Sequence, residues 1–189
     1  GDLIDGDLDV RRADVAPLQA LSAPDGVYTI PGNHEYYFGY PQWMEYYQSL
    51  GMQVLANQHV VIDNEGANLV LAGVTDFTAA RHAFAAPNVE EAIAEAPSDS
   101  PIIMLDHQPR NAVAAATAGV DLQLSGHTHG GMILGFDRLV ASANNGFVSG
   151  VYNIQDMTLY VNNGTGLWPG FALRLGKPSE LTRITLRQG

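Results

Sequence analysis

The chain alternates between short apolar runs rich in β-branched residues and longer segments in which apolar residues recur every three or four positions. The short runs predict β-strands at residues 26–30, 54–57, 59–62, 68–74, 101–105, 121–125, 157–161 and 181–186. The longer segments predict helices at residues 11–21, 41–50, 88–96 and 110–118. Strands that alternate with helices predict an α/β fold, with sheet at the centre and helices outside.

Polar loops follow three of these strands. "PGNHE" comes after the first, "DHQP" after residues 101–105 and "SGHTHGG" after residues 121–125. The chain opens on "GDLIDG", which has the pattern of a loop after a further strand lying before residue 1. Ligands of open α/β sheets bind at the carboxyl ends of the strands. We therefore expect these loops to meet at one edge, where they would gather His34, His107, His127 and His129.

The side chains in these loops favour a metal site. They offer nitrogen and oxygen donors, and the chain has no cysteine, which suits divalent Mn, Fe, Zn, Ni or Co. An isolated His-x-His pair can equally be structural, but four donor-bearing loops in one chain point to metal. His127 and His129 face the same way only if the backbone between them is extended. In a turn they would face two different ions.

The composition limits the classes of function. A chain of 189 residues, 46% hydrophobic and 15% charged, suits a single folded domain spanning residues 1–189. Its formal charge of −11 repels phosphate backbones, so we expect no nucleic-acid partner. No apolar run approaches the roughly 20 residues of a membrane span, and the sequence shows no signal peptide.

The blocks "GDLID", "GNHE", "HQP" and "GHTHGG", in this order, resemble the calcineurin-like metallophosphoesterase superfamily over nearly the whole chain. The stretch "NNGTGLWPGFALRLGKPSELTRITL" is similar to a bacterial branch often attached to membranes by N-terminal segments. The resemblance implies a β-sandwich flanked by helices, in four layers of order α/β/β/α, with two divalent metal ions at one edge. By the same resemblance Asp2 would bridge both ions. Asn33, His107 and His127 would complete the shell of one ion, and His129 would bind the other.

The chain also departs from the family pattern. Members open with an Asp-x-His block on a strand before "GDLID", whereas this chain begins after that block. One ion would keep four ligands and the other only Asp2 and His129, which predicts tighter binding of one ion than of two. We expect the chain to be the C-terminal part of a longer, membrane-attached bacterial protein, and to be inactive alone. Strand edges left uncovered invite pairing with another chain, so self-association is expected.

Phosphoester hydrolysis accounts for these residue types. Two ions roughly 3.5–4 Å apart can hold a hydroxide nucleophile and lower the pKa of water from 15.7 to roughly 7. His34 would then act as the general acid, protonating the leaving group. The sequence has no cysteine, no nucleophilic serine elbow and no phosphate-binding P-loop, so a metal-bridging hydroxide is the simplest nucleophile. The substrate would be a small phosphorylated molecule such as a phosphodiester, a nucleotide-sugar or a lipid-linked pyrophosphate.

Several alternatives stay open. A non-catalytic regulatory or scaffolding domain could hold a partner through the same metals, but it would not need a proton donor such as His34. A one-metal structural site would need a closed ligand shell. Asp5 could orient a ligand histidine or cap a turn, and Glu35 could cap a helix or touch the site. Arg110 and Arg174 could clamp phosphate or form salt bridges. The aromatic stretch "YYFGYPQWMEYY" could pack a helix or wall the leaving group.

Overall fold

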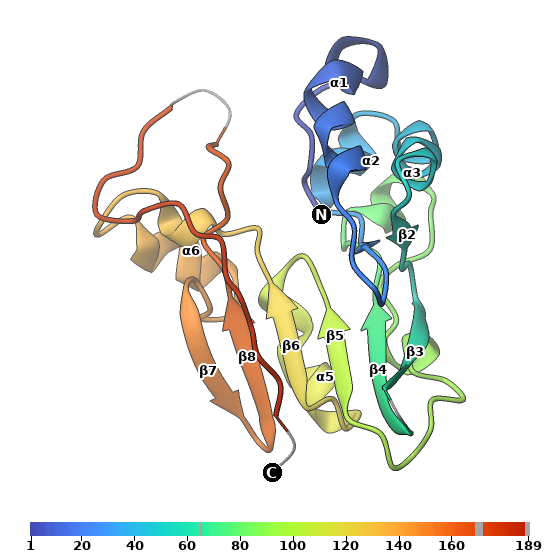
Figure 1. Cartoon of the computed structure of the whole chain (residues 1–189). Coiled ribbons are helices and arrows are strands. Elements are labelled where there is room, and N and C mark those ends of the chain that lie inside the picture. Colours follow the sequence, from blue (N-terminus) through green and yellow to red (C-terminus); the bar gives the residue numbers. More distant parts are fainter. Residues whose placement is uncertain (65, 169–171, 188–189) are drawn as a thin grey trace.

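The computed structural model describes residues 1–64, 66–168 and 172–187 as a mixed α/β fold built on a central six-stranded sheet (Figure 1). The predicted α/β class, with a multi-stranded sheet flanked by helices, is confirmed. The order across the sheet is β3 (Gln58–Asn64), β4 (Ala67–Gly73), β5 (Ile102–Leu105), β6 (Leu122–Ser125), β8 (Met157–Val161) and β7 (Gly150–Ile154). The four inner strands are parallel to one another, and the two outer strands are antiparallel to their neighbours.

One face of the sheet packs against α4 (Val89–Ala92) and α5 (Ala112–Thr117). Small side chains on α5 allow its backbone to approach the sheet, where Met104 and Leu159 are fully buried. Burying such a side chain stabilises the fold by about 1.5–3 kcal/mol. Asn88 caps α4, because its side chain accepts a hydrogen bond from the backbone N–H of Glu91 at 3.1 Å.

A second cluster is formed by α1 (Leu8–Val15), α2 (Asn33–Tyr37) and α3 (Tyr40–Ser49), above one end of the sheet (Figure 1). Its core is Trp43 and Tyr47, which are both fully buried. Beneath it, β1 (Tyr28–Thr29) and β2 (Gln53–Val54) form a parallel pair, the second sheet of the described residues.

The remaining elements are short. α6 (Asp137–Ala143) follows the "SGHTHGG" loop. Short 3-10 turns lie at Ala16–Ala20, Ala79–His82, Pro109–Asn111 and His129–Gly131. Within the described residues, no helix has both the length and the apolar character needed to cross a membrane.

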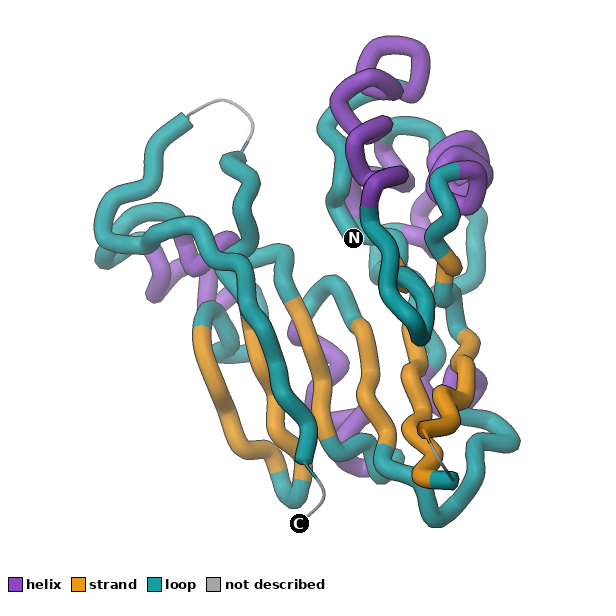
Figure 2. Tube along the Cα trace, in the orientation of Figure 1, coloured by secondary structure: helices purple, strands orange, loops and turns teal. Residues whose placement is uncertain are grey.

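One predicted strand is wrong and one observed strand was missed. Residues 181–186 are extended beside β8 (Figure 2), but they form no backbone ladder with it. Thr182 instead makes side-chain hydrogen bonds with Tyr160 and Asn162. The alternating apolar pattern of this segment therefore does not make it a strand, because its backbone has no pairing partner. β7 pairs with β8 through a tight turn in which Gln155 has a left-handed φ of 53°. That turn lacks the glycine or asparagine that usually marks a hairpin in a sequence. The helices α2 and α6 were also not predicted.

Candidate metal centre

Each candidate ligand directly follows a strand or lies at the start of the chain. Asn33 and His34 begin α2 just after β1, His107 follows β5, and His127 follows β6. Asp2 lies in the opening segment, which packs against the loop before α2. Because the ends of β5 and β6 are neighbours in a parallel ladder, the loops after them meet at one edge of the sheet.

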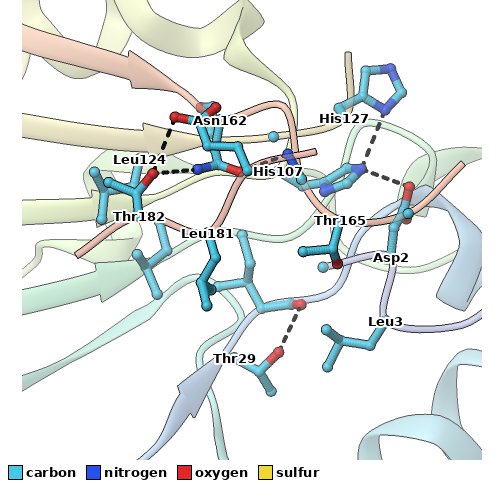
Figure 3. A pocket seen from close by; sticks show the side chains of 18 of the residues that line it. Asp2, Leu3, Thr29, His107, Leu124, His127, Asn162, Thr165, Leu181 and Thr182 are labelled. Atoms are coloured by element: carbon cyan, nitrogen blue, oxygen red, sulfur yellow. Dashed lines mark hydrogen bonds and ion pairs between the residues drawn. The ribbon is translucent and has the colours of Figure 1, made fainter. Parts of the chain in front are cut away.

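The side chains of Asp2, His107 and His127 gather in one place (Figure 3), and the side chain of Asn33 contacts His107. His107 Nε2 lies 2.9 Å from Asp2 Oδ2, 3.2 Å from His127 Nδ1 and 3.2 Å from Asn33 Oδ1. The ligand atoms of the aspartate and the two histidines all lie within 4.8 Å of one another. A ring nitrogen carries at most one hydrogen, so it cannot satisfy three neighbours at once. A divalent cation accepts several lone pairs, and this donor set therefore fits one.

Burial and mutual charge shift the pKa values of Asp2, His107 and His127. Burial opposes charge on His107, but the Asp2 carboxylate outweighs it, and the pKa of His107 is raised. Burial also opposes charge on Asp2, yet His107 and then His34 hold the pKa of that carboxyl well below its usual range. Burial, followed by the charge on His107, lowers the pKa of His127 to about 3. The His127 ring is therefore uncharged at neutral pH, which is the form that binds a metal ion.

The backbone around Asp2 allows little variation. Its φ is 55°, in the left-handed region, and its Oδ1 accepts a hydrogen bond from the backbone N–H of His34 at 2.9 Å. A Cβ on Gly32 would overlap with the Asp2 carboxylate. Glycine at position 32 is thus what lets the carboxylate pack against the "GNHE" loop.

His34 lies beside this group of ligands. Its Nε2 is 3.9 Å from Asp2 Oδ2, and its Nδ1 is 3.3 Å from Asp5 Oδ1. Asp5 therefore contacts the expected proton donor, rather than one of the expected ligand histidines. The His34 ring is flanked by Tyr37 at 5.8 Å and Phe38 at 6.1 Å between centroids.

His129 contacts the segment after β8. His127 and His129 both have left-handed φ values, 67° and 52°, so the backbone between them turns. The Nδ1 of His129 lies 3.3 Å from the carbonyl oxygen of Gly166, and its ring meets Trp168 edge to face at 6.0 Å. Burial lowers the pKa of His129. Among the described residues His129 is outside the tight group, and its role toward a second ion stays a prediction.

The two candidate phosphate clamps, Arg110 and Arg174, both donate hydrogen bonds to backbone carbonyl oxygens, and their role toward phosphate stays a prediction. Arg110 donates to the carbonyl oxygen of Ala143 at 3.0 Å from Nε and at 2.5 Å from Nη2. Arg174 donates from Nη1 and Nη2 to the carbonyl oxygens of His129, Asn163, Gly164, Gly166 and Lys177. Arg174 therefore holds the loop that carries His129 against the segment after β8.

Sequence reasoning gave too little weight to two buried acids. Glu35 is fully buried and accepts hydrogen bonds from the segment that contains Asp2. Asp106 lies beneath His107, where burial raises its pKa to about 7 although Asn111 donates to it at 2.8 Å. The only available signal was their place in the "GNHE" and "DHQP" loops, which does not reveal the burial of a carboxylate.

A cavity of about 550 Å³ opens beside the ligands. Asp2, His107 and His127 form part of its wall, and apolar side chains such as Leu3 and Leu124 form much of the rest (Figure 3). His129 lines the same cavity. The centre is therefore accessible to a small molecule.

Comparison with known proteins places the chain in a family. Residues 1–131 match the model of the calcineurin-like phosphoesterase family. An uncharacterised metallophosphoesterase of Helicobacter pylori is 36% identical over 98% of this chain and 49% of its own length. A cattle transmembrane protein with a metallophosphoesterase domain is 37% identical over 99% of this chain and 44% of its own length. An uncharacterised metallophosphoesterase of Aquifex aeolicus is 32% identical over 99% of this chain and 70% of its own length. No solved structure matches.

The chain spans about half the length of the first two of these relatives. It belongs to the calcineurin-like phosphoesterase family, and the predicted superfamily is confirmed.

Proposed function

We propose that the protein hydrolyses a phosphoester in a reaction that depends on divalent metal. Family membership supports this reaction type in general. The observation that carries the proposal is the grouping of Asp2, His107 and His127 in the wall of a cavity, with Asn33 in contact with His107. Divalent ions bound there would supply Lewis-acid chemistry, neutralising phosphoryl oxygens and making water acidic enough to attack.

Asp2 and His127 have different tasks in this proposal. Asp2 brings the negative charge that attracts a cation, and Oδ2 is its oxygen nearest to His107. His127 adds a neutral nitrogen, because its pKa of about 3 keeps the ring uncharged at neutral pH. Asn33 adds a neutral oxygen, which leaves the loaded centre with enough positive charge to attract phosphate. We also propose that Asp2 and His129 hold a second ion, with further ligands from a longer protein that contains this chain.

His34 is the proposed proton donor. Its Nε2 lies 3.9 Å from Asp2 Oδ2. The ring is thus close to the proposed metal ligands without belonging to that group. When the ring carries hydrogens on both nitrogens, Asp5 can accept the one on Nδ1, which leaves the one on Nε2 to be donated. A leaving-group oxygen beside Asp2 would then be within reach of a proton.

The proposed substrate is small and phosphorylated: a phosphodiester, a nucleotide-sugar or a lipid-linked pyrophosphate. The acidic chain disfavours long polyanions. The cattle relative is a transmembrane protein, which supports membrane attachment of the longer protein that we expect to contain this chain. Membrane attachment would bring lipid-linked substrates within reach.

Self-association is a separate proposal. β3 and β7 are the outer strands of the described sheet, and exposed apolar residues such as Val61 and Val151 lie on them. Such edges can pair with another chain. Light scattering should show a mass above that of one chain, and a stable monomer would contradict the proposal.

A panel of phosphoesters tests the function. The longer protein that we expect to contain this chain is freed of metal, loaded with Mn²⁺ or Zn²⁺ and assayed beside its His127→Ala variant and a control, His59→Ala. His59 bonds to the carbonyl oxygen of Ala92, away from the expected ligands. Hydrolysis by the wild type and the control, and its loss in His127→Ala, would support the proposal. Metal binding without hydrolysis of any ester would instead favour the non-catalytic alternative.

A further inference from the structure

Glu35 is a fully buried carboxylate with four hydrogen-bond donors around it. Its Oε2 accepts from the backbone N–H of Gly32 at 2.7 Å and of Asp2 at 2.9 Å. Its Oε1 accepts from the backbone N–H of Leu3 and from the Tyr47 hydroxyl, both at 2.9 Å. Burying a carboxylate is costly unless it is well hydrogen-bonded, and these contacts satisfy both oxygens.

Helix capping explains only one of these bonds. Glu35 is the third residue of α2 and closes a capping box with the N–H of Gly32. The bonds to Asp2 and Leu3 come from a segment more than 30 residues earlier in the chain. Capping needs neither of them, so they call for a second explanation.

The two remote bonds involve consecutive N–H groups on either side of the Asp2 α-carbon. Asp2 has a φ of 55°, a conformation that is unfavourable for a residue other than glycine. Turns that include a left-handed residue direct successive N–H groups to one point, where they form a concave site for an anion. Here the anion is the Glu35 carboxylate. Its contacts stabilise the conformation that directs the Asp2 side chain to His107.

We propose that Glu35 is a positioning residue that sets the geometry of the metal centre. It holds Asp2 in the left-handed conformation and ties the Asp2 segment to the loop that carries Asn33. The ligands supplied by these two segments thus keep a constant separation, whether or not metal is bound. The inference rests on the proposed metal centre. It makes metal affinity depend on Glu35, a residue that would not itself bind the metal.

The test compares two variants that remove contacts from the same carboxylate. Glu35→Gln keeps the shape but turns one oxygen into an NH₂ group, which must face at least one backbone N–H. Tyr47→Phe removes a donor that touches no expected ligand. Binding of Mn²⁺ alone is measured by calorimetry, and thermal unfolding is measured with a chelator present. Glu35→Gln should weaken Mn²⁺ binding by about 10–100-fold, the range for groups that orient ligands.

Tyr47→Phe should lower the unfolding temperature while leaving Mn²⁺ affinity near that of the wild type. Wild-type affinity in Glu35→Gln would overturn the positioning role. So would losses of affinity that simply follow the loss of stability in both variants. A wild-type protein that binds no Mn²⁺ would overturn the proposed function and the positioning role together, whereas the first two outcomes overturn the positioning role alone.

A measurement on the wild type needs no variant to fold. Hydrogen exchange at the amides of Leu3 and Gly32 is followed by NMR in the metal-free protein. Both amides should be protected, because Glu35 holds them before any metal arrives. Exchange at the rate of an unfolded chain would overturn the proposal.

Discussion

Replacing His34 with alanine should slow hydrolysis most for the esters whose leaving groups most need a proton. The imidazole lies 3.9 Å from the Asp2 carboxylate and is paired at 3.3 Å with Asp5, so it is placed to act on substrate rather than to bind metal. Loss of a general acid costs about 10²–10⁴-fold in rate, or about 2.7–5.5 kcal/mol of transition-state free energy. Metal content should not change, because the ring is outside the tight ligand group.

The assay uses aryl phosphodiesters graded by the pKa of the leaving phenol, in the longer protein that we expect to contain this chain. A plot of log kcat/KM against that pKa should be shallow for the wild type and for the control His59→Ala. It should be steep for His34→Ala, because a nitrophenolate departs without a proton whereas a poorer leaving group does not. Parallel plots with metal retained would refute the role as acid, and loss of metal from His34→Ala would make it a ligand.

The remaining predictions concern stability and the loop that holds His129. The pKa of Asp106 is raised from 3.8 to about 7, so its contribution to stability is greatest below pH 4 and is lost as the pH rises through about 7. Urea unfolding of the metal-free protein should show this loss between pH 5 and pH 8, and Asp106→Asn should lack it; equal pH dependence in both would contradict the assignment. Arg174→Lys loses the planar fork that spans several carbonyl oxygens. Arg174→Lys should speed proteolysis of the loop near His129 without changing Mn²⁺ affinity, whereas a rise in KM with unchanged proteolysis would favour the phosphate clamp. Trp43→Ala empties a fully buried site and should cost about 3–5 kcal/mol of unfolding free energy, measured in urea; a cost below about 1 kcal/mol would show that the α1–α3 core is less tightly packed than described.

The polar residues in the loops that follow strands were the part of the sequence that best predicted the site. The structure brings together Asp2, Asn33, His107 and His127, the four side chains that the motifs group around one ion. The loops after β5 and β6 meet because parallel strands end at a common edge. Asp2 and Asn33 come from the opening segment and the start of α2, outside that sheet. Whether these side chains bind metal is still a prediction.

What the sequence could not provide depends on backbone conformation and long-range contacts. The direction of His129 follows from left-handed φ values at positions 127 and 129, which no spacing rule reveals. Arg174 is occupied by carbonyl oxygens from segments that are distant in the chain. Residues 181–186 alternate like a strand but find no backbone partner. In each case the local pattern allowed several outcomes, and tertiary contacts selected one.

The central claim is that Asp2, Asn33, His107 and His127 hold a divalent ion. Its most direct test is elemental analysis of protein loaded with Mn²⁺ and dialysed to remove loosely bound metal. The ligand count predicts about one ion per chain in the wild type and in His59→Ala, and almost none in His127→Ala. A wild type that retains no ion, or a His127→Ala protein that retains as much as the wild type, would contradict the account.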